Sequence, residues 1–225
     1  AIERGIGLNV EIPDIIVGNL APQITLRPYQ VRAIERFIFY QEQYKERANP
    51  AHLLFEMATG SGKTVVMAAA ILYLYEQGYR NFMFFVNSKQ IIEKTKDNFL
   101  NTASPKYLFA NTMRTPDGPL RVRPVENFDE AVGEAINIHF TTIQGLHYAL
   151  QNPQENSVTF EDLEARKIVL LADEAHRLNA STKSRPSIDE VEEMTSWEST
   201  VERVFASNPD NVLLEFTATA DLQHP

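Results

Sequence analysis

Short apolar runs alternate with amphipathic stretches along most of this chain. Runs with the length and composition of buried strands lie at His52–Phe55, Phe82–Val86, Ile136–Phe140, Lys167–Ala172 and Asn211–Phe216. Apolar residues at helical spacing separate these runs, at Pro28–Tyr44, Val65–Tyr75, Ser88–Leu100, Thr141–Gln151 and Ser196–Ala206. This alternation predicts an α/β domain with an open, mostly parallel β-sheet and helices on both faces.

Four stretches depart from the alternation. Residues 6–12 alternate apolar and polar with a period of two, which predicts an edge strand ending at Pro13. Residues 14–26 are expected to be irregular, and residues 103–127, which hold four prolines, are expected to form a long loop or small insertion rather than core. Residues 179–194 are polar and acidic without periodicity, which suggests a mobile loop. We therefore expect an N-terminal strand or arm at 1–26 and one domain at 27–225.

The strongest chemical signal lies between the first buried strand and the helix after it, where residues 57–64 read M-A-T-G-S-G-K-T. Glycines there allow a tight turn whose N–H groups, with the start of the helix, can bind phosphate. The residues expected around the phosphates are Thr59, Gly60, Ser61 and Gly62. Lys63 would reach the β- and γ-phosphates, and the Thr64 hydroxyl would bind Mg²⁺. The alternative is a Gly/Ser loop in which Gly-Lys-Thr occurs by chance.

One position departs from the common phosphate-loop pattern. That pattern has a glycine five residues before Gly62, where this chain has Met57. The departure disfavours a generic kinase or GTPase and favours the A-x-T-G-x-G-K-T form found in nucleic-acid helicases and translocases.

A second signal follows another strand, where Ala172 is succeeded by D-E-A-H, residues 173–176. Two adjacent carboxylates at a strand tip suit Mg–nucleotide hydrolysis, with Asp173 on the water shell of the metal and Glu174 polarising the attacking water. Taken alone, the tetrapeptide could instead be an acidic helix N-terminus. A third strand ends in T-A-T, so that Thr217 and Thr219 could form hydrogen bonds to the Asp173–Glu174 region and relay nucleotide state. The alternative is that they are ordinary strand residues.

Composition narrows the setting of this chemistry. The chain has no cysteine, no apolar run near the ~20 residues of a membrane span and no signal-peptide pattern, so we expect a soluble, cytoplasmic protein. A net charge of −9 argues against a broadly basic nucleic-acid surface. A local cluster of Arg114, Arg121 and Arg123 could still contact nucleic acid, or could simply be solvated.

Together these motifs resemble the first RecA-like domain of superfamily 2 DEAH-box helicases and translocases, over nearly the whole chain. The resemblance implies a RecA-like P-loop fold that uses ATP and Mg²⁺ on DNA, and a site completed by arginines of a second RecA-like domain. In the glutamine-motif position stands L-R-P-Y-Q, which would place Gln30 on the adenine edge with Arg27 nearby, although Gln30 could be a plain helix-surface residue. His176 would couple hydrolysis to the second domain. The DNA-contact motifs would fall at Asn87, Ser88, Thr141, Thr142 and Gln144.

Within that superfamily, the strings M-A-T-G-S-G-K-T, D-E-A-H-R-L-N-A and L-L-E-F-T-A-T-A-D look like the restriction (Res) subunit of bacterial or archaeal type III restriction-modification enzymes. Type I restriction subunits, another DNA or RNA helicase, and a non-motor nucleotide-binding assembly module are the alternatives. The resemblance implies a methylation and specificity (Mod) partner and an endonuclease domain. Such nucleases use P-D followed by D/E-x-K, and none of the eight lysines here has an acidic residue two positions before it. We therefore expect this stretch to be a motor domain that lacks the nuclease and hydrolyses ATP weakly by itself.

Overall fold

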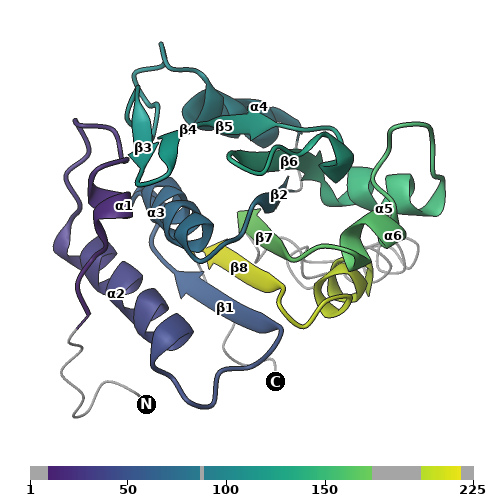
Figure 1. Ribbon diagram of the computed structural model, residues 1–225, viewed down its shortest axis with the longest axis horizontal. Coiled ribbons are helices and arrows are strands. Elements are labelled where there is room, and N and C mark those ends of the chain that lie inside the picture. The colour runs from purple at the N-terminus through teal and green to yellow at the C-terminus, as the bar shows by residue number, and fades with distance from the viewer. Residues whose placement is uncertain (1–9, 87–88, 174–198, 219–225) are drawn as a thin grey trace.

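The computed structural model describes residues 10–86, 89–173 and 199–218 (Figure 1). Its main sheet has six strands, all parallel, in the order β1-β8-β7-β2-β6-β5. These strands are β1 (Ala51–Glu56), β2 (Asn81–Val86), β5 (Val122–Pro124), β6 (Ile136–Thr142), β7 (Ile168–Asp173) and β8 (Val212–Thr217). The predicted α/β class and parallel sheet are confirmed, and the five expected strands begin and end within two residues of their predicted bounds.

Helices connect the strands. They are α1 (Asp14–Val17), α2 (Pro28–Glu42), α3 (Lys63–Glu76), α4 (Lys89–Leu100), α5 (Ile143–Gln151), α6 (Phe160–Glu164) and the 3₁₀ turn η1 (Phe128–Glu130). Residues 199–206 are also helical, as the sequence predicts for 196–206. Gly78 follows α3 with a φ of 85°, and Tyr79 N–H bonds to Leu74 C=O at 2.9 Å, so a glycine ends this helix.

The two faces of the sheet carry separate cores, because successive strand residues point in opposite directions. Phe82 and Phe84 of β2 belong to the core that packs against α1, α2, α3 and α4. Met83 and Phe85 belong to the second core, with α5, α6 and residues 199–206. Helices therefore cover both faces, as predicted. Helix α3 lies between the sheet and helices α1 and α2, which is why ten consecutive residues of it, 66–75, are buried.

Two expectations about irregular regions were wrong, and the edge strand predicted at 6–12 is absent from the part of it that the structure describes. Residues 10–12 of that predicted strand have no strand structure, whereas its residues 6–9 lie outside the described residues. Helix α1 forms within the segment expected to be irregular. The sequence did not indicate it, because one helical turn with two buried isoleucines is too short to show a period. Residues 103–127 contain the hairpin of β3 (Met113–Thr115) and β4 (Gly118–Leu120), followed by β5 at the edge of the sheet.

The proline-rich insertion is compatible with strands because of where its prolines lie. Pro119 belongs to a two-stranded hairpin and Pro124 to the edge strand β5, positions at which a missing N–H is tolerated. Met113 and Leu120, opposite each other in the hairpin, are buried in the first core. This region therefore contributes core as well as surface.

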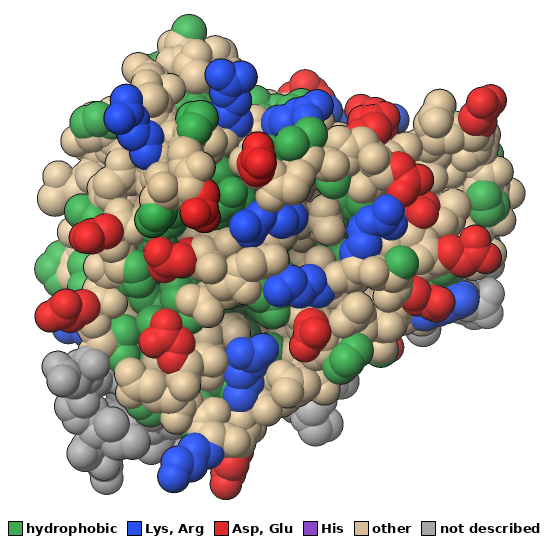
Figure 2. Space-filling model, viewed as in Figure 1, with side chains coloured by type: hydrophobic (Ala, Val, Ile, Leu, Met, Phe, Trp, Pro, Cys, Tyr) green, Lys and Arg blue, Asp and Glu red, His purple; other side chains and the backbone are tan. Residues whose placement is uncertain are grey.

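One face of the molecule carries charges of both signs (Figure 2). Figure 2 shows acidic and basic side chains interspersed over one face, so that this face is not broadly basic. Arg114, Arg121 and Arg123 are all exposed, on the β3–β4 hairpin and its continuation into β5. Contact of these arginines with nucleic acid stays a prediction.

Within the described residues, no helix is long and apolar enough to cross a membrane, and no group of three or more His, Asp or Glu side chains is placed to hold a metal ion.

Candidate functional site

The candidate site is built at the carboxyl edge of three neighbouring strands. Strand β8 lies between β1 and β7, with Glu56 in register with Thr217 and Asp173 in register with Phe216. Because all three strands are parallel, the loop that follows β1, Thr217 and Asp173 come to the same edge of the sheet. At a strand spacing of about 4.8 Å, the strand that ends in Asp173 lies roughly 10 Å from β1. The fold thus brings together the phosphate loop, the first acidic residue and the first threonine of the three sequence motifs.

The phosphate loop has the backbone geometry that its glycines predict. Gly60 has a φ of 75° and Gly62 a φ of 82°, both in the left-handed region. Gly62 is also the N-cap of α3, so the N–H groups of Lys63 and Thr64 belong to the first turn and have no partner inside the helix. The N–H groups of Gly60 and Gly62 make no hydrogen bond within the part of the chain that the structure describes. The loop therefore presents four N–H donors beside the positive end of a helix dipole, which suits an anion.

Two donor groups of the loop make hydrogen bonds to carbonyl groups of the loop itself. Ser61 N–H donates to the Ala58 carbonyl at 3.1 Å, so it is not one of the free donors. The Lys63 ammonium donates to the carbonyls of Met57 at 3.1 Å and Ala58 at 3.5 Å. A cation is thus held over the loop by neutral carbonyls, and phosphate oxygens would be stronger partners for it because they carry charge.

Met57 shows why this loop does without the usual first glycine. The residues with positive φ in the described chain are Asn156 and four glycines, so Met57 has an ordinary backbone conformation that needs no glycine. Its side chain is 8% exposed and belongs to the first core. Its N–H donates to the Thr217 carbonyl at 2.9 Å, while its own carbonyl accepts from Lys63. The main chain of Met57 therefore links the end of β8 to the lysine of the loop.

The start of α2 supports the loop from the other side. The Gln30 amide accepts from Arg27 N–H at 2.9 Å and donates to the Ser61 carbonyl at 2.9 Å. Gln30 is 4% exposed, so its side chain is buried against the loop and is not a plain surface residue. Tyr29 donates its hydroxyl to the same Ser61 carbonyl at 2.8 Å, and Arg27 Nη1 donates to the Tyr29 oxygen at 3.1 Å. The adenine contact predicted for Gln30 stays a prediction, because both ends of its amide bond to protein here.

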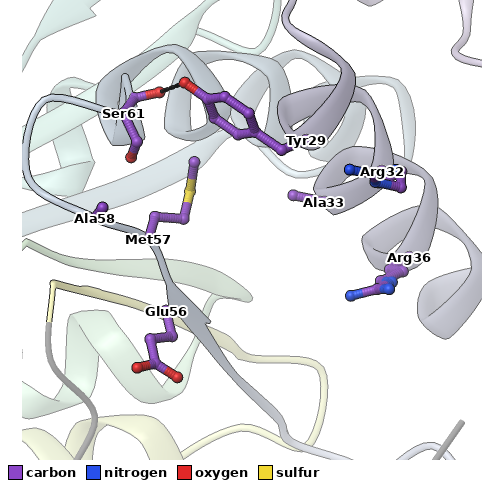
Figure 3. A pocket seen from close by; sticks show the side chains of 8 residues that line it. All are labelled: Tyr29, Arg32, Ala33, Arg36, Glu56, Met57, Ala58 and Ser61. Carbon is purple, nitrogen blue, oxygen red and sulfur yellow. Dashed lines mark hydrogen bonds between the residues drawn. The ribbon is translucent and has the colours of Figure 1, made fainter. Parts of the chain in front are cut away.

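A cavity of about 560 Å³ opens beside the loop, between α2 and the end of β1 (Figure 3). Helix α2 contributes one wall, and the end of β1 with the loop contributes the other. The lining residues are Tyr29, Arg32, Ala33, Arg36, Glu56, Met57, Ala58 and Ser61. Its volume is in the usual range of small-ligand sites, and an aromatic ring, a carboxylate and two guanidinium groups give it both stacking and hydrogen-bonding capacity.

Sequence reasoning missed most of this cavity, although a signal was present. Tyr29, Arg32, Ala33 and Arg36 recur at positions three, four and seven residues after the first, which places them on one face of α2. That face is turned toward the phosphate loop. The pattern of polar and aromatic residues on it could have been noticed beside the apolar stripe that packs into the core.

Among the remaining predicted site residues, those on β6 lie farther along the same edge. Thr141 and Thr142 end β6, and the Thr142 hydroxyl caps α5 by accepting from Gly145 N–H at 2.9 Å. Gln144 is exposed, whereas Thr217 is 2% exposed and its side chain is therefore buried in the edge. The other predicted residues, Asn87, Ser88, Glu174, His176 and Thr219, lie outside the described residues.

Comparison with known proteins identifies the family of the chain. Residues 23–222 match the family model "Type III restriction enzyme, res subunit". A probable type III restriction-modification enzyme Res subunit of Haemophilus influenzae, HindVIP, is 38% identical over an alignment of 231 residues. The alignment covers 92% of this chain and 44% of the relative. The endonuclease subunit of a type I restriction enzyme of Staphylococcus saprophyticus, SsaAORF53P, is 28% identical over 155 residues, which cover 68% of this chain and 15% of that subunit. This chain thus spans less than half the length of either relative.

Among solved structures, the UvsW helicase of bacteriophage T4 shares the fold, with a TM-score of 0.51 at 13% identity, over 94% of this chain and 61% of the helicase. This likeness agrees with the RecA-like fold expected from the motifs. The family-model match covers most of the chain, including the phosphate loop and the strand that ends in Asp173. The chain therefore belongs to the family of type III restriction enzyme Res subunits.

Proposed function

We propose that this chain is the ATP-binding motor domain of a DNA translocase. The observation that carries the proposal is the shared strand edge, where unpaired N–H groups of the phosphate loop, Lys63 and Asp173 come together. Lys63 would bind the β- and γ-phosphates, and Thr64 and Asp173 would hold Mg²⁺, the latter through water. Glu174 would orient the attacking water. Bound Mg²⁺ would supply charge neutralisation on the phosphates.

The parent protein, on this proposal, is the restriction subunit of a type III restriction-modification enzyme. Support comes from the family match and from the Res subunit of Haemophilus influenzae, of which this chain covers 44%. Residues 27–225 would be the first RecA-like domain, with residues 1–26 leading into it. The second RecA-like domain and the nuclease would lie in the rest of such a protein, and a Mod subunit would supply methylation and sequence specificity. The match to a type I endonuclease subunit makes a type I assignment the second candidate.

Replacing Lys63 with alanine is expected to weaken binding of Mg–ATP to the chain at least tenfold. The substitution removes a cation that lies over the loop carbonyls and would pair with phosphate charge, and charged hydrogen bonds contribute roughly 1.5–3 kcal/mol each. Calorimetric titration of wild type and variant with Mg–ATP measures the loss. Lys94→Ala, which removes an exposed lysine of α4, is the matched control and should bind as wild type does. Equal affinity of the Lys63 variant and wild type would contradict the proposed role of the loop.

The isolated 225-residue chain is expected to bind nucleotide but to hydrolyse it slowly. Arginines supplied from a neighbouring domain stabilise the transition state of phosphoryl transfer and raise rates by about 10³- to 10⁵-fold. We expect those arginines to belong to the second RecA-like domain. Steady-state phosphate release, measured with and without double-stranded DNA, checks this prediction. Rapid DNA-stimulated turnover by the chain alone would show that it needs no second domain.

A further inference from the structure

We infer that Tyr29, a residue of the L-R-P-Y-Q string to which the resemblance assigns no role, is a positioning residue for nucleotide binding. Its hydroxyl holds the Ser61 carbonyl on the α2 side and thereby aims the Gly62 N–H at a bound phosphate. The inference rests on the proposed function, since it concerns how the phosphate loop binds nucleotide. It extends that function to a residue outside the loop.

The Ser61 carbonyl accepts two hydrogen bonds from α2. One comes from the Tyr29 hydroxyl at 2.8 Å and the other from the Gln30 amide at 2.9 Å. Arg27 Nη1 donates to the Tyr29 oxygen at 3.1 Å, which leaves the phenolic proton directed at Ser61. Arg27, Tyr29 and Ser61 thus form one chain of hydrogen bonds from the helix start to the loop.

The consequence follows from the geometry of the peptide unit. In a planar trans peptide, the C=O and N–H groups point in opposite directions. Fixing the Ser61 carbonyl toward α2 therefore fixes the Gly62 N–H away from α2. That N–H makes no hydrogen bond within the described part of the chain, so it is available to an incoming anion. A donor whose direction is set before binding needs less reorganisation when the phosphate arrives.

A substitution at Tyr29 can remove its hydrogen bond without disturbing the fold, whereas a substitution at Gln30 cannot. Gln30 is buried and also bonds to Arg27 N–H at the start of α2, so its removal would disturb the helix. Tyr29 is 37% exposed, and a phenylalanine there keeps the ring and removes only the hydroxyl. Tyr148, 61% exposed on α5, offers the same substitution away from the site.

The experiment uses three proteins: Tyr29→Phe, Tyr148→Phe and wild type. Each is loaded with a fluorescent ATP analogue, which is then displaced by titration with one of two competitors, Mg–ATP or tripolyphosphate. Removing one hydrogen bond should weaken Mg–ATP binding by about three- to tenfold. Because the hydroxyl acts through the phosphate loop, tripolyphosphate should lose affinity by the same factor as ATP. The melting temperature without nucleotide should stay within about 2 °C of wild type, since one partly exposed hydrogen bond is removed. Tyr148→Phe should match wild type throughout.

Two results would overturn the inference. Unchanged affinity for both competitors in Tyr29→Phe would show that the hydroxyl does not position the loop. A loss confined to ATP, with tripolyphosphate unaffected, would show that Tyr29 contacts the base from the cavity instead. The Lys63→Ala titration separates these results from failure of the proposed function, because it tests whether the loop binds nucleotide at all.

Discussion

Replacing Gly62 with alanine should destabilise the chain by about 2–3 kcal/mol and weaken Mg–ATP binding by more than tenfold. Two independent effects contribute. A non-glycine residue in the left-handed region costs about 1–2 kcal/mol, and Gly62 has a φ of 82°. In addition, the new Cβ would lie 2.5 Å from Gln30 Nε2, so the side chain that donates to Ser61 must move. Urea unfolding and nucleotide titration measure the two losses.

Gly60→Ala is the matched control for this prediction. Gly60 also has a positive φ, 75°, but a Cβ there would meet nothing within 4 Å. The two variants therefore share the backbone strain, and only Gly62→Ala disturbs the contact with α2. We expect Gly60→Ala to lose less stability than Gly62→Ala. Equal losses would mean that the approach of Gln30 to the loop has no energetic weight.

Replacing Met57 with glycine should destabilise the chain by about 3–5 kcal/mol, although it restores the commoner phosphate-loop pattern. Removal of a buried Met side chain costs about 2–5 kcal/mol, and glycine adds roughly 0.5–1 kcal/mol of backbone entropy. The side chain at 57 is 8% exposed and packs in the core beside α2 and α3. Denaturant unfolding of the purified variant gives the change in the free energy of unfolding.

Met57→Leu distinguishes packing from any special role of the thioether. It conserves volume and should cost less than about 1.5 kcal/mol, with nucleotide affinity unchanged. Wild-type stability of Met57→Gly would contradict the packing argument. A Met57→Leu variant as unstable as Met57→Gly would show that shape alone does not account for the residue.

The sequence predicted the strands and the site edge well because burial leaves a strong local signal. Strands such as Phe82–Val86 are apolar on both sides, as strands covered by helices on both faces must be. Once the sheet is parallel, residues at strand ends must share one edge, so Lys63 and Asp173 could be brought together without knowledge of strand order.

What the sequence left undetermined depends on contacts between distant segments. Nothing local to β5 shows that Val122 pairs with Ile136 at the edge of the sheet, and its proline, Pro124, argues against a strand. Likewise, the bond from Tyr29 to Ser61 joins residues 32 positions apart, across a helix and a strand. Such contacts depend on how distant segments pack together, and the pattern of apolar and polar residues along the sequence does not show this.

The position of β8 also has a consequence for how the protein is made. Among the described strands, β1 pairs with β8 alone, and the pairing joins Ala51 to Val212. A ribosome synthesises the phosphate loop about 150 residues before the strand that lies beside it, and pairing between such distant segments is slow. Until residues 212–217 emerge, β1 has no neighbouring strand and the loop cannot be held beside Asp173. A nascent chain therefore carries the residues of the phosphate loop long before strand β8 is present to hold them in place.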